Sequence, residues 1–229
     1  MFIGHYAPAF VAAGTRRGPK LAAMFVAAQL VDIAYFGLIL AGIEHMRETP
    51  GHTVMSPGDF YHMPYTHSLL GSIGFAAAWA AATRLMRRDW RVAWIGAAVV
   101  LSHWFLDLLV HAPDLTILGE GTRYGFALWN HPAIEMPLEL GLTAITFAFY
   151  LSRTRARSRQ GHIAPAFLAL TLLALQLVNW FGGQPTRVVD PVPATTPLTA
   201  LFAYALLAAL AWWTSRVRQA PAGASVTPL

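Results

Sequence analysis

The sequence predicts an all-α fold, a polytopic bundle of membrane-spanning helices, from its composition and from the arrangement of its apolar residues. Of the 229 residues, 56% are hydrophobic and 12% are charged, whereas about 25% of the residues in soluble domains are charged. The hydrophobic residues form long blocks, which is typical of segments that cross a bilayer. The basic residues lie between these blocks and form no single patch, so the expected partner is the lipid bilayer and no nucleic acid.

Six blocks are long enough to cross a membrane, because each is close to the about 20 residues that a transmembrane helix needs. Proline suits the opening turn of a helix, and Gly18-Pro19 precedes the first block. Gly182-Gly183 ends the fifth block. The predicted spans are 21–43, 66–86, 92–111, 133–152, 163–183 and 197–215.

The first 14 residues, MFIGHYAPAFVAAG, are apolar but too short to span the bilayer. They lack the basic start of a signal peptide and an obvious cleavage site, so we expect them to be retained. The segment is predicted to be a re-entrant or half-length helix that ends at Arg16-Arg17. Other helices must then shield it, because irregular backbone does not face lipid.

The basic residues predict the orientation of the spans. The connections alternate between those rich in Lys and Arg and those that hold only Arg47, Arg123 and Arg187. Since cytoplasmic loops carry the excess of basic residues, both termini are expected in the cytoplasm. The sequence therefore predicts one transmembrane domain over residues 1–215 and a disordered cytoplasmic tail over 216–229, which is rich in small residues and proline.

Carboxylates inside the predicted spans are the main sign of function. An acidic side chain at the centre of a bilayer costs about 2.5–3.5 kcal/mol on insertion scales, so it needs a partner, water or a metal ion. Apart from Arg84, which lies at the basic end of the span 66–86, no Lys or Arg lies inside a predicted span to pair with them. The four buried acids are Asp32, Asp107, Glu135 and Glu139.

One span carries histidines beside such an acid. His103, Asp107 and His111 recur every four residues and therefore share one helix face. A histidine and a carboxylate one turn apart can bind a single metal ion. The alternative is a structural hydrogen bond between His103 and Asp107, and His111 either joins the site or lies at the outer membrane interface.

The other polar residues in the spans also have two interpretations. His67, in Thr66-His67-Ser68, is either a metal ligand or part of a capped helix start. Asp32 is a metal ligand, a proton carrier or a substrate contact. Glu135 and Glu139 share one helix face, and either is suited to act as a general base or as a ligand. The histidines at 45, 52 and 131 are expected to be solvated loop residues.

The estimated depths of these groups agree. A rise of about 1.5 Å per residue places Asp32 and His103 each about 18 Å above their basic anchors, Lys20 and Arg91. His67 and Glu139 lie at about 26 and 21 Å by the same measure, and His5 at about 16 Å if the first segment is a half-helix. The sequence therefore predicts a polar pocket in the outer half of the membrane.

This set of motifs resembles that of a family of bacterial inner-membrane, metal-dependent hydrolases that is distantly related to zinc-dependent phospholipase C. The resemblance covers about residues 1–115, and Met63-Pro64 stands where the family has Arg-Gly, which weakens the case for His62 as a ligand. It implies a hydrolytic site with two or three metal ions in the bacterial inner membrane. The motifs that carry it are Gly4-His5, Asp32, His62-x4-His67-Ser68 and His103-x3-Asp107.

Imidazoles combined with carboxylates suit zinc, with manganese or iron as alternatives, and the absence of cysteine excludes thiolate ligands. The predicted metal ligands are His5, Asp32, His67, His103, Asp107 and His111, and the predicted catalytic residues are Glu135 and Glu139. We expect metal-activated water to hydrolyse an ester or phosphoester of a lipid or lipid-linked substrate. The alternatives are an ion- or proton-coupled transporter that uses the intramembrane carboxylates and a haem protein with paired histidine ligands.

Overall fold

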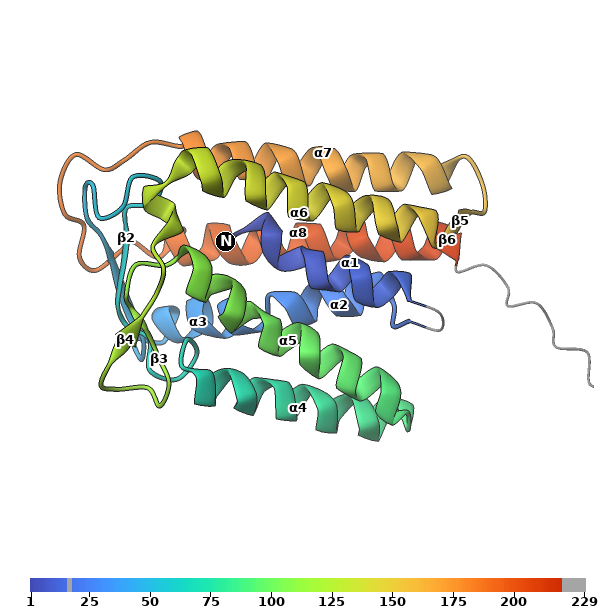
Figure 1. Cartoon of the computed structure of the whole chain (residues 1–229), viewed down its shortest axis with the longest axis horizontal. Helices are drawn as coiled ribbons and strands as arrows, with labels where there is room; N and C mark the ends of the chain where they lie inside the picture. Colours follow the sequence, from blue (N-terminus) through green and yellow to red (C-terminus); the bar gives the residue numbers. More distant parts are fainter. Residues whose placement is uncertain (16–17, 220–229) are drawn as a thin grey trace, which may run out of the picture.

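The computed structural model describes residues 1–15 and 18–219, so Arg16-Arg17 and residues 220–229 of the predicted tail lie outside the described residues. The described chain is mostly helical, and five of its helices are long and apolar enough to cross a membrane. They run along the long axis of the molecule (Figure 1) and give it the architecture of a multi-pass membrane protein. These helices are α4 (Leu69–Arg87), α5 (Trp90–Val110), α6 (Pro132–Ser152), α7 (Gln160–Phe181) and α8 (Thr195–Val217).

Polar caps set the starts of two of these helices and shift them from the predicted boundaries. The Ser68 hydroxyl accepts a hydrogen bond from the Gly71 N–H at 3.0 Å, so α4 begins after the predicted residue 66. The Asp89 carboxylate accepts from the Arg91 and Val92 N–H groups, so α5 begins before residue 92. Each cap satisfies N–H groups that have no partner within the helix.

The first predicted span is broken. Residues 21–43 were expected to form one helix, but α2 (Leu21–Ala28) and α3 (Leu30–Leu40) meet at an angle of 52°. The two pieces count as a sixth candidate span only if they cross the membrane together. The break at Gln29 contains neither proline nor glycine. The buried Gln29 amide instead donates to the Phe2 carbonyl at 3.3 Å, a tertiary contact that helix propensity does not encode.

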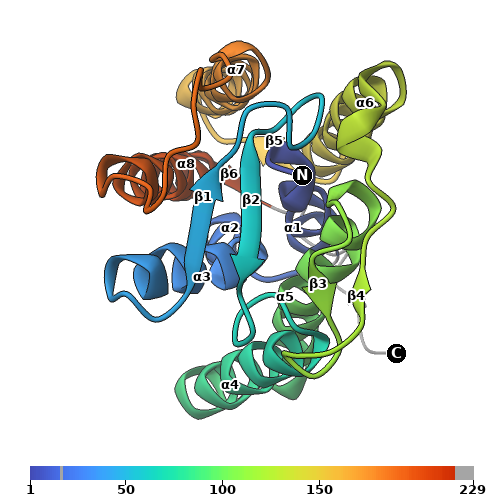
Figure 2. The same cartoon turned by 90° about the vertical axis from the view of Figure 1, so that its left-hand side faces the viewer.

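The N-terminal segment is a short helix inside the bundle. It comprises a 3-10 turn, η1 (Ile3–Tyr6), and α1 (Ala7–Gly14). The chain starts near the middle of the bundle's length, and α1 runs toward the end that holds β5 and β6 (Figure 1). Figure 2 shows the start of the chain surrounded by helices, and α1 packs against α2, α5 and α6. Its Phe10 lies between Phe25 and Phe147, with ring centroids 5.2 and 5.1 Å away, and anchors the buried apolar core.

Three short antiparallel strand pairs lie in the connections of the described chain, which is otherwise mostly helical, as the all-α class predicts. They are β1 (His45–Glu48) with β2 (Gly58–His62), β3 (Leu115–Thr116) with β4 (Arg123–Tyr124), and β5 (Arg155–Ala156) with β6 (Arg218–Gln219). The first two pairs cover one end of the bundle, and β5–β6 lies at the other (Figures 1 and 2). A second 3-10 turn, η2 (Leu128–Asn130), precedes α6.

The end of α8 is anchored rather than loose. The helix continues to Val217, and the Arg218 guanidinium donates to the Thr154 hydroxyl at 2.9 Å and to the Gly161 carbonyl at 2.8 Å. These bonds tie α8 to the connection between α6 and α7. Helix α8 therefore continues past residue 215, where the transmembrane domain was expected to end.

Candidate metal centre

A cluster of buried histidine and aspartate side chains lies in the half of the bundle nearer β1–β4. Its members come from η1, α3, the segment before α4, and α5, which are far apart in sequence. The ligand atoms form two groups of three that share His103, and the atoms of each group lie within 4.8 Å of one another. The cluster residues are His5, Asp32, His67, His103 and Asp107.

Helix α5 provides the centre of the cluster. His103 and Asp107 lie one turn apart, as the spacing predicts, with His103 Nε2 3.0 Å from Asp107 Oδ2. His111, which caps the end of the helix, places its Nε2 3.5 Å from Asp107 Oδ1. Asp107 therefore presents one oxygen to His103 and the other to His111. All three side chains are buried.

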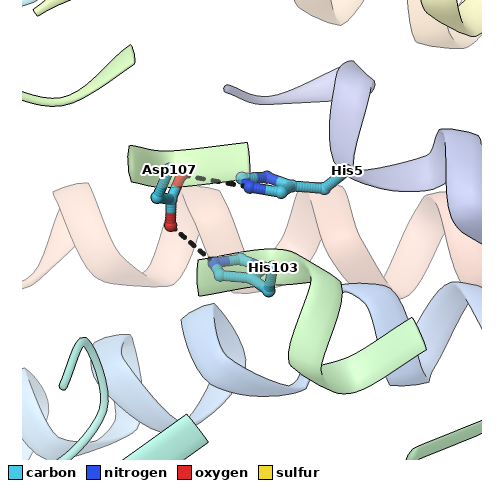
Figure 3. A group of neighbouring side chains, drawn as sticks. All are labelled: His5, His103 and Asp107. Atoms are coloured by element: carbon cyan, nitrogen blue, oxygen red, sulfur yellow. Dashed lines mark ion pairs between the residues drawn. The ribbon is translucent and has the colours of Figure 1, made fainter. Parts of the chain in front are cut away.

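The N-terminal segment places His5 beside the Asp107 carboxylate. His5 Nε2 lies 3.0 Å from Asp107 Oδ1, and Figure 3 shows His5 and His103 approaching Asp107 from two different elements. The Met1 nitrogen also lies 3.3 Å from Asp107 Oδ1. Since His5 is 1% exposed, it has no access to bulk water.

Asp32 and His67 are the remaining members of the cluster. Asp32, in the first turn of α3, places Oδ1 3.3 Å from Nε2 of both His67 and His103. Its second oxygen accepts a hydrogen bond from the Tyr204 hydroxyl of α8 at 2.8 Å. His67 Nε2 also lies 3.6 Å from Asp107 Oδ2. The cluster thus links α3, α5 and α8, and the start of α4.

The outer nitrogens of the rings are held by oxygen atoms. His103 Nδ1 lies 2.8 Å from the Ala28 carbonyl, which only accepts hydrogen bonds, so Nδ1 carries the proton. The helix break at Gln29 makes this possible, because the Ala28 carbonyl at the end of α2 is not used within a continuous helix. A neutral His103 therefore turns the lone pair of Nε2 toward the cluster. Metal-binding histidines show this arrangement.

His67 is oriented in a similar way by two linked hydrogen bonds through the Thr66 hydroxyl, which we call the Glu44–Thr66–His67 relay. The buried Glu44 carboxylate accepts a hydrogen bond from the Thr66 hydroxyl at 2.6 Å. Because that hydroxyl has a single proton, its oxygen accepts from His67 Nδ1 at 2.9 Å. His67 Nε2 then faces Asp32 and Asp107 with a lone pair. His111 Nδ1 is similarly held by Asp114 Oδ1 at 3.0 Å.

The donor set fits a cation. The Nε2 atoms of His67 and His103 face carboxylate oxygens at 3.0–3.6 Å. When both rings are neutral with the proton on Nδ1, these are lone pairs that face oxygens, an arrangement that repels unless a cation lies between them. His103 Nε2 and Asp107 Oδ2 lack a hydrogen-bond partner within the described residues, despite their short separation. Ligand atoms around a four-coordinate ion with bonds of about 2.0–2.1 Å lie about 3.3 Å apart. The observed separations match that spacing.

The two predicted catalytic glutamates lie on α6, beside the N-terminal segment. Glu139 Oε1 accepts hydrogen bonds from the Phe2 and Gly4 N–H groups at 2.6 and 2.9 Å. Its Oε2 accepts from Gln176 Nε2 of α7 at 2.9 Å. Glu135 is fully buried, and neither of its oxygens has a hydrogen-bond partner in the described part of the chain. The contacts of Glu139 are therefore to the backbone near His5.

The remaining histidines that the sequence raised lie apart from the cluster. His62 is exposed on β2, where its ring stacks on His45 with centroids 5.5 Å apart. His131 is exposed at the start of α6. His52 lies in the loop between β1 and β2. None of them belongs to the groups of candidate ligands found among the described residues.

A cavity of about 620 Å³ leads to the cluster. Asp32, His67, Asp107 and His111 line its inner side. Its far wall is formed by the ends of α7 and α8 nearest β1–β4 and is apolar around Val178. The described residues that line it include no Lys or Arg. The cavity therefore joins a polar, acidic inner side to a wall on α7 and α8 in which apolar residues such as Val178 and Ala203 lie beside Thr195 and Thr199.

Four supporting residues were not predicted as part of the site: Glu44, Asp114, Tyr204 and Gln176. Glu44 and Asp114 fall in the predicted outer connections, where acidic residues are usually solvated, so their burial had no sequence signal. Tyr204 lies in an apolar span that contains no other sign of function. Gln176 was also missed, although a buried amide in the predicted span 163–183 is a usable signal.

No protein-family model, curated protein or solved structure matches the chain. The resemblance to inner-membrane hydrolases therefore depends on the short motifs within residues 1–115.

Proposed function

We propose that the chain is a membrane-embedded, metal-dependent hydrolase that acts on an ester or phosphoester. The observation that carries this proposal is the orientation of His67 and His103. Neighbouring oxygens hold the Nδ1 atoms of both rings, and the two Nε2 atoms converge on Asp32 and Asp107. Side chains held in this way before a ligand binds favour metal coordination over solvated or structural roles.

The ligands would be His5, Asp32, His67, His103 and Asp107, with His111 on the outer side. Asp107 supports a site with more than one ion, because Oδ1 faces His5 and His111 while Oδ2 faces His67 and His103. Zinc is the proposed metal, with manganese and iron as alternatives for this set of nitrogen and oxygen donors. A bound ion would supply Lewis acidity, which polarises an ester or phosphoester oxygen and makes water a better nucleophile near neutral pH.

The protein's own groups then bind and orient the substrate. The apolar residues of the wall along α7 and α8, such as Val178 and Ala203, suit an acyl or isoprenoid chain, and the inner side of the cavity would receive the scissile group. The Tyr204 hydroxyl holds Asp32 in place from the same cavity. Of the two predicted bases on α6, Glu135 is the one without a hydrogen-bond donor in the described chain, although it is fully buried and does not line the cavity. This combination supports a lipid or lipid-linked substrate.

The proposed topology follows from the basic residues and the helices together. The bent pair α2–α3 would act as one span, giving six spans, and η1–α1 would be a re-entrant helix. The C-terminus and the connection after α1 would lie in the cytoplasm of a bacterial cell, with the protein in the inner membrane. Met1 itself is buried in the bundle beside Asp107, so the expected cytoplasmic position of the N-terminus would not apply to it. The cavity would then open toward the outer leaflet.

A transporter is the second candidate, and the break between α2 and α3 favours it. Broken helices with charged residues beside the break line ion and substrate sites in many transporters, and Asp32 lies one turn after this break. The histidine-rich cluster and its oriented rings favour the hydrolase, because proton or ion coupling does not require them.

One experiment separates the two candidates. Detergent-purified protein would be stripped with a chelator, reloaded with zinc, manganese or iron, and tested on long-chain fluorogenic esters and phosphodiesters. Metal-dependent hydrolysis that is lost in Asp107→Asn supports the hydrolase. A protein that binds no metal but moves protons across reconstituted vesicles supports the transporter and contradicts the hydrolase.

A further inference from the structure

The N-terminal segment begins a helix in the middle of the bundle, where lipid offers no hydrogen-bond acceptors. The first N–H groups of any helix lack partners within it. In a membrane protein, other parts of the protein must satisfy them. The residue before η1, Phe2, provides no side-chain cap. The start of the chain therefore depends on groups from neighbouring helices.

Two side chains from different helices provide the missing acceptors. Glu139 of α6 accepts from the N–H groups of Phe2 and Gly4 at 2.6 and 2.9 Å. Gln176 of α7 accepts from the N–H of Ile3 at 3.3 Å. Glu139 and Gln176 are each at most 1% exposed, so water does not compete for these bonds.

Glu139 and Gln176 also contact each other, and a third side chain, Gln29, contacts the same backbone. Gln176 Nε2 donates to Glu139 Oε2 at 2.9 Å, which fixes the orientation of both groups. Gln29, at the break between α2 and α3, donates to the Phe2 carbonyl at 3.3 Å. The backbone of Phe2 is thus held on its donor and acceptor sides by side chains from separate helices.

We propose that Glu139, Gln176 and Gln29 form a clamp whose role is to position His5 in the cluster. His5 follows directly after the held backbone, and its Nε2 reaches Asp107 Oδ1 at 3.0 Å. The proposal rests on the proposed metal site, in which His5 is a ligand. It makes Glu139 a positioning residue, whereas the sequence predicted a catalytic base. A carboxylate suits this place, because the N-terminus of a helix carries partial positive charge.

Position 4, whose N–H donates to Glu139, is a closely packed glycine. A Cβ on Gly4 would lie 2.5 Å from Met1 Sδ and 3.4 Å from Glu139 Cγ. A Cβ at position 4 would therefore displace the Met1 side chain and make an ordinary contact with Glu139, whose carboxylate accepts from the N–H groups of residues 2 and 4. The start of η1 and the Glu139 carboxylate are thus in direct contact.

The test combines metal binding with a direct probe of the segment. The chain has no cysteine, so Ala9→Cys places a single thiol on the buried face of α1. Zinc affinity, measured by competition with a chelator, and the rate of labelling by N-ethylmaleimide would be compared in Glu139→Leu and Gln176→Leu. Thr146→Val, another buried polar-to-apolar change on α6, is the matched control.

The leucine variants are expected to bind zinc at least about tenfold more weakly and to label much faster, whereas the control matches the parent in both readouts. Glu139→Gln keeps an acceptor oxygen and is expected to fall between them. If the leucine variants do not fold, Glu139→Gln and Gln29→Met provide the same comparison. Parent-like labelling in the clamp variants overturns the proposal, as does parent-like zinc affinity. If the parent itself binds no zinc, the metal site fails and the labelling rates alone decide the clamp.

Discussion

The imidazole rings of His5 and His103 lie face to face, with centroids 3.9 Å apart and planes inclined by 8°. Both rings direct Nε2 toward Asp107 at 3.0 Å. Two imidazolium ions stacked this closely in a buried site would repel each other strongly. Neutral imidazoles are the form that binds metals. The stack therefore favours two neutral rings that share a cation over a pair of protonated histidines.

Removing the hydroxyl that links Glu44 to His67 tests the orientation of that ring. Thr66→Val keeps the shape of the side chain but leaves His67 Nδ1 without its acceptor. Zinc affinity, measured by competition with a chromophoric chelator, is expected to fall about 10–100-fold. Thr53→Val removes a buried hydroxyl in the loop between β1 and β2 and should leave the affinity unchanged. Equal affinities in the two variants would contradict the role of the relay.

Narrowing the cavity tests where the substrate binds. Ala203 lines the apolar wall on α8, one residue before Tyr204. Ala203→Phe is expected to slow hydrolysis of long-chain esters about tenfold by displacing the chain from its reactive position. Short-chain esters and the metal content should be unaffected. An equal loss for both ester lengths would place the acyl chain elsewhere.

The core around the N-terminal segment makes a prediction about stability. Phe10 is fully buried between Phe25 and Phe147. Phe10→Ala is expected to lower the free energy of unfolding by roughly 3–5 kcal/mol, because it leaves a cavity in a packed core. The comparison is Phe202→Ala on the outer face of α8, where the side chain is 69% exposed. Unfolding in detergent, followed by tryptophan fluorescence, should separate the two variants clearly.

The cysteine-free sequence also allows a simple test of topology. Val54→Cys lies in the loop between β1 and β2, and Ser158→Cys lies between α6 and α7; both positions are exposed. A membrane-impermeant maleimide added to intact bacterial cells is expected to label only Val54→Cys. Ser158→Cys should react after the membrane is opened. Labelling of Ser158→Cys alone in intact cells would reverse the proposed orientation.

Local sequence patterns were enough to locate most of the helices. Long apolar blocks predicted α4 to α8 within a few residues, because burial in lipid requires the same apolar length whatever the tertiary contacts. The break between α2 and α3 was missed, since it depends on the contact between Gln29 and the N-terminal segment. The strand pairs at the bundle ends were missed for a similar reason: each depends on pairing between segments, such as Arg155 with Gln219, that share no local signal.

In the candidate site, too, local sequence patterns predicted some features, and others depend on tertiary contacts. The helical spacing of His103 and Asp107 and the depth of Asp32 predicted residues that the structure brings within 3.3 Å or less of one another. The orientation of the rings was beyond sequence reasoning, because it depends on Glu44, Asp114 and the Ala28 carbonyl. Glu139 was predicted to be a general base or a ligand, but its hydrogen bonds to the backbone of residues 2 and 4 depend on the tertiary fold.

The most direct test of the central claim is the metal content of the purified protein. Inductively coupled plasma mass spectrometry would be applied to the parent, His103→Ala, Asp107→Asn and, as a control, His52→Ala from the loop between β1 and β2. The metal site predicts stoichiometric zinc, manganese or iron in the parent and in His52→Ala, and its loss from the two cluster variants. A folded parent without metal, or equal metal in all four proteins, would contradict it.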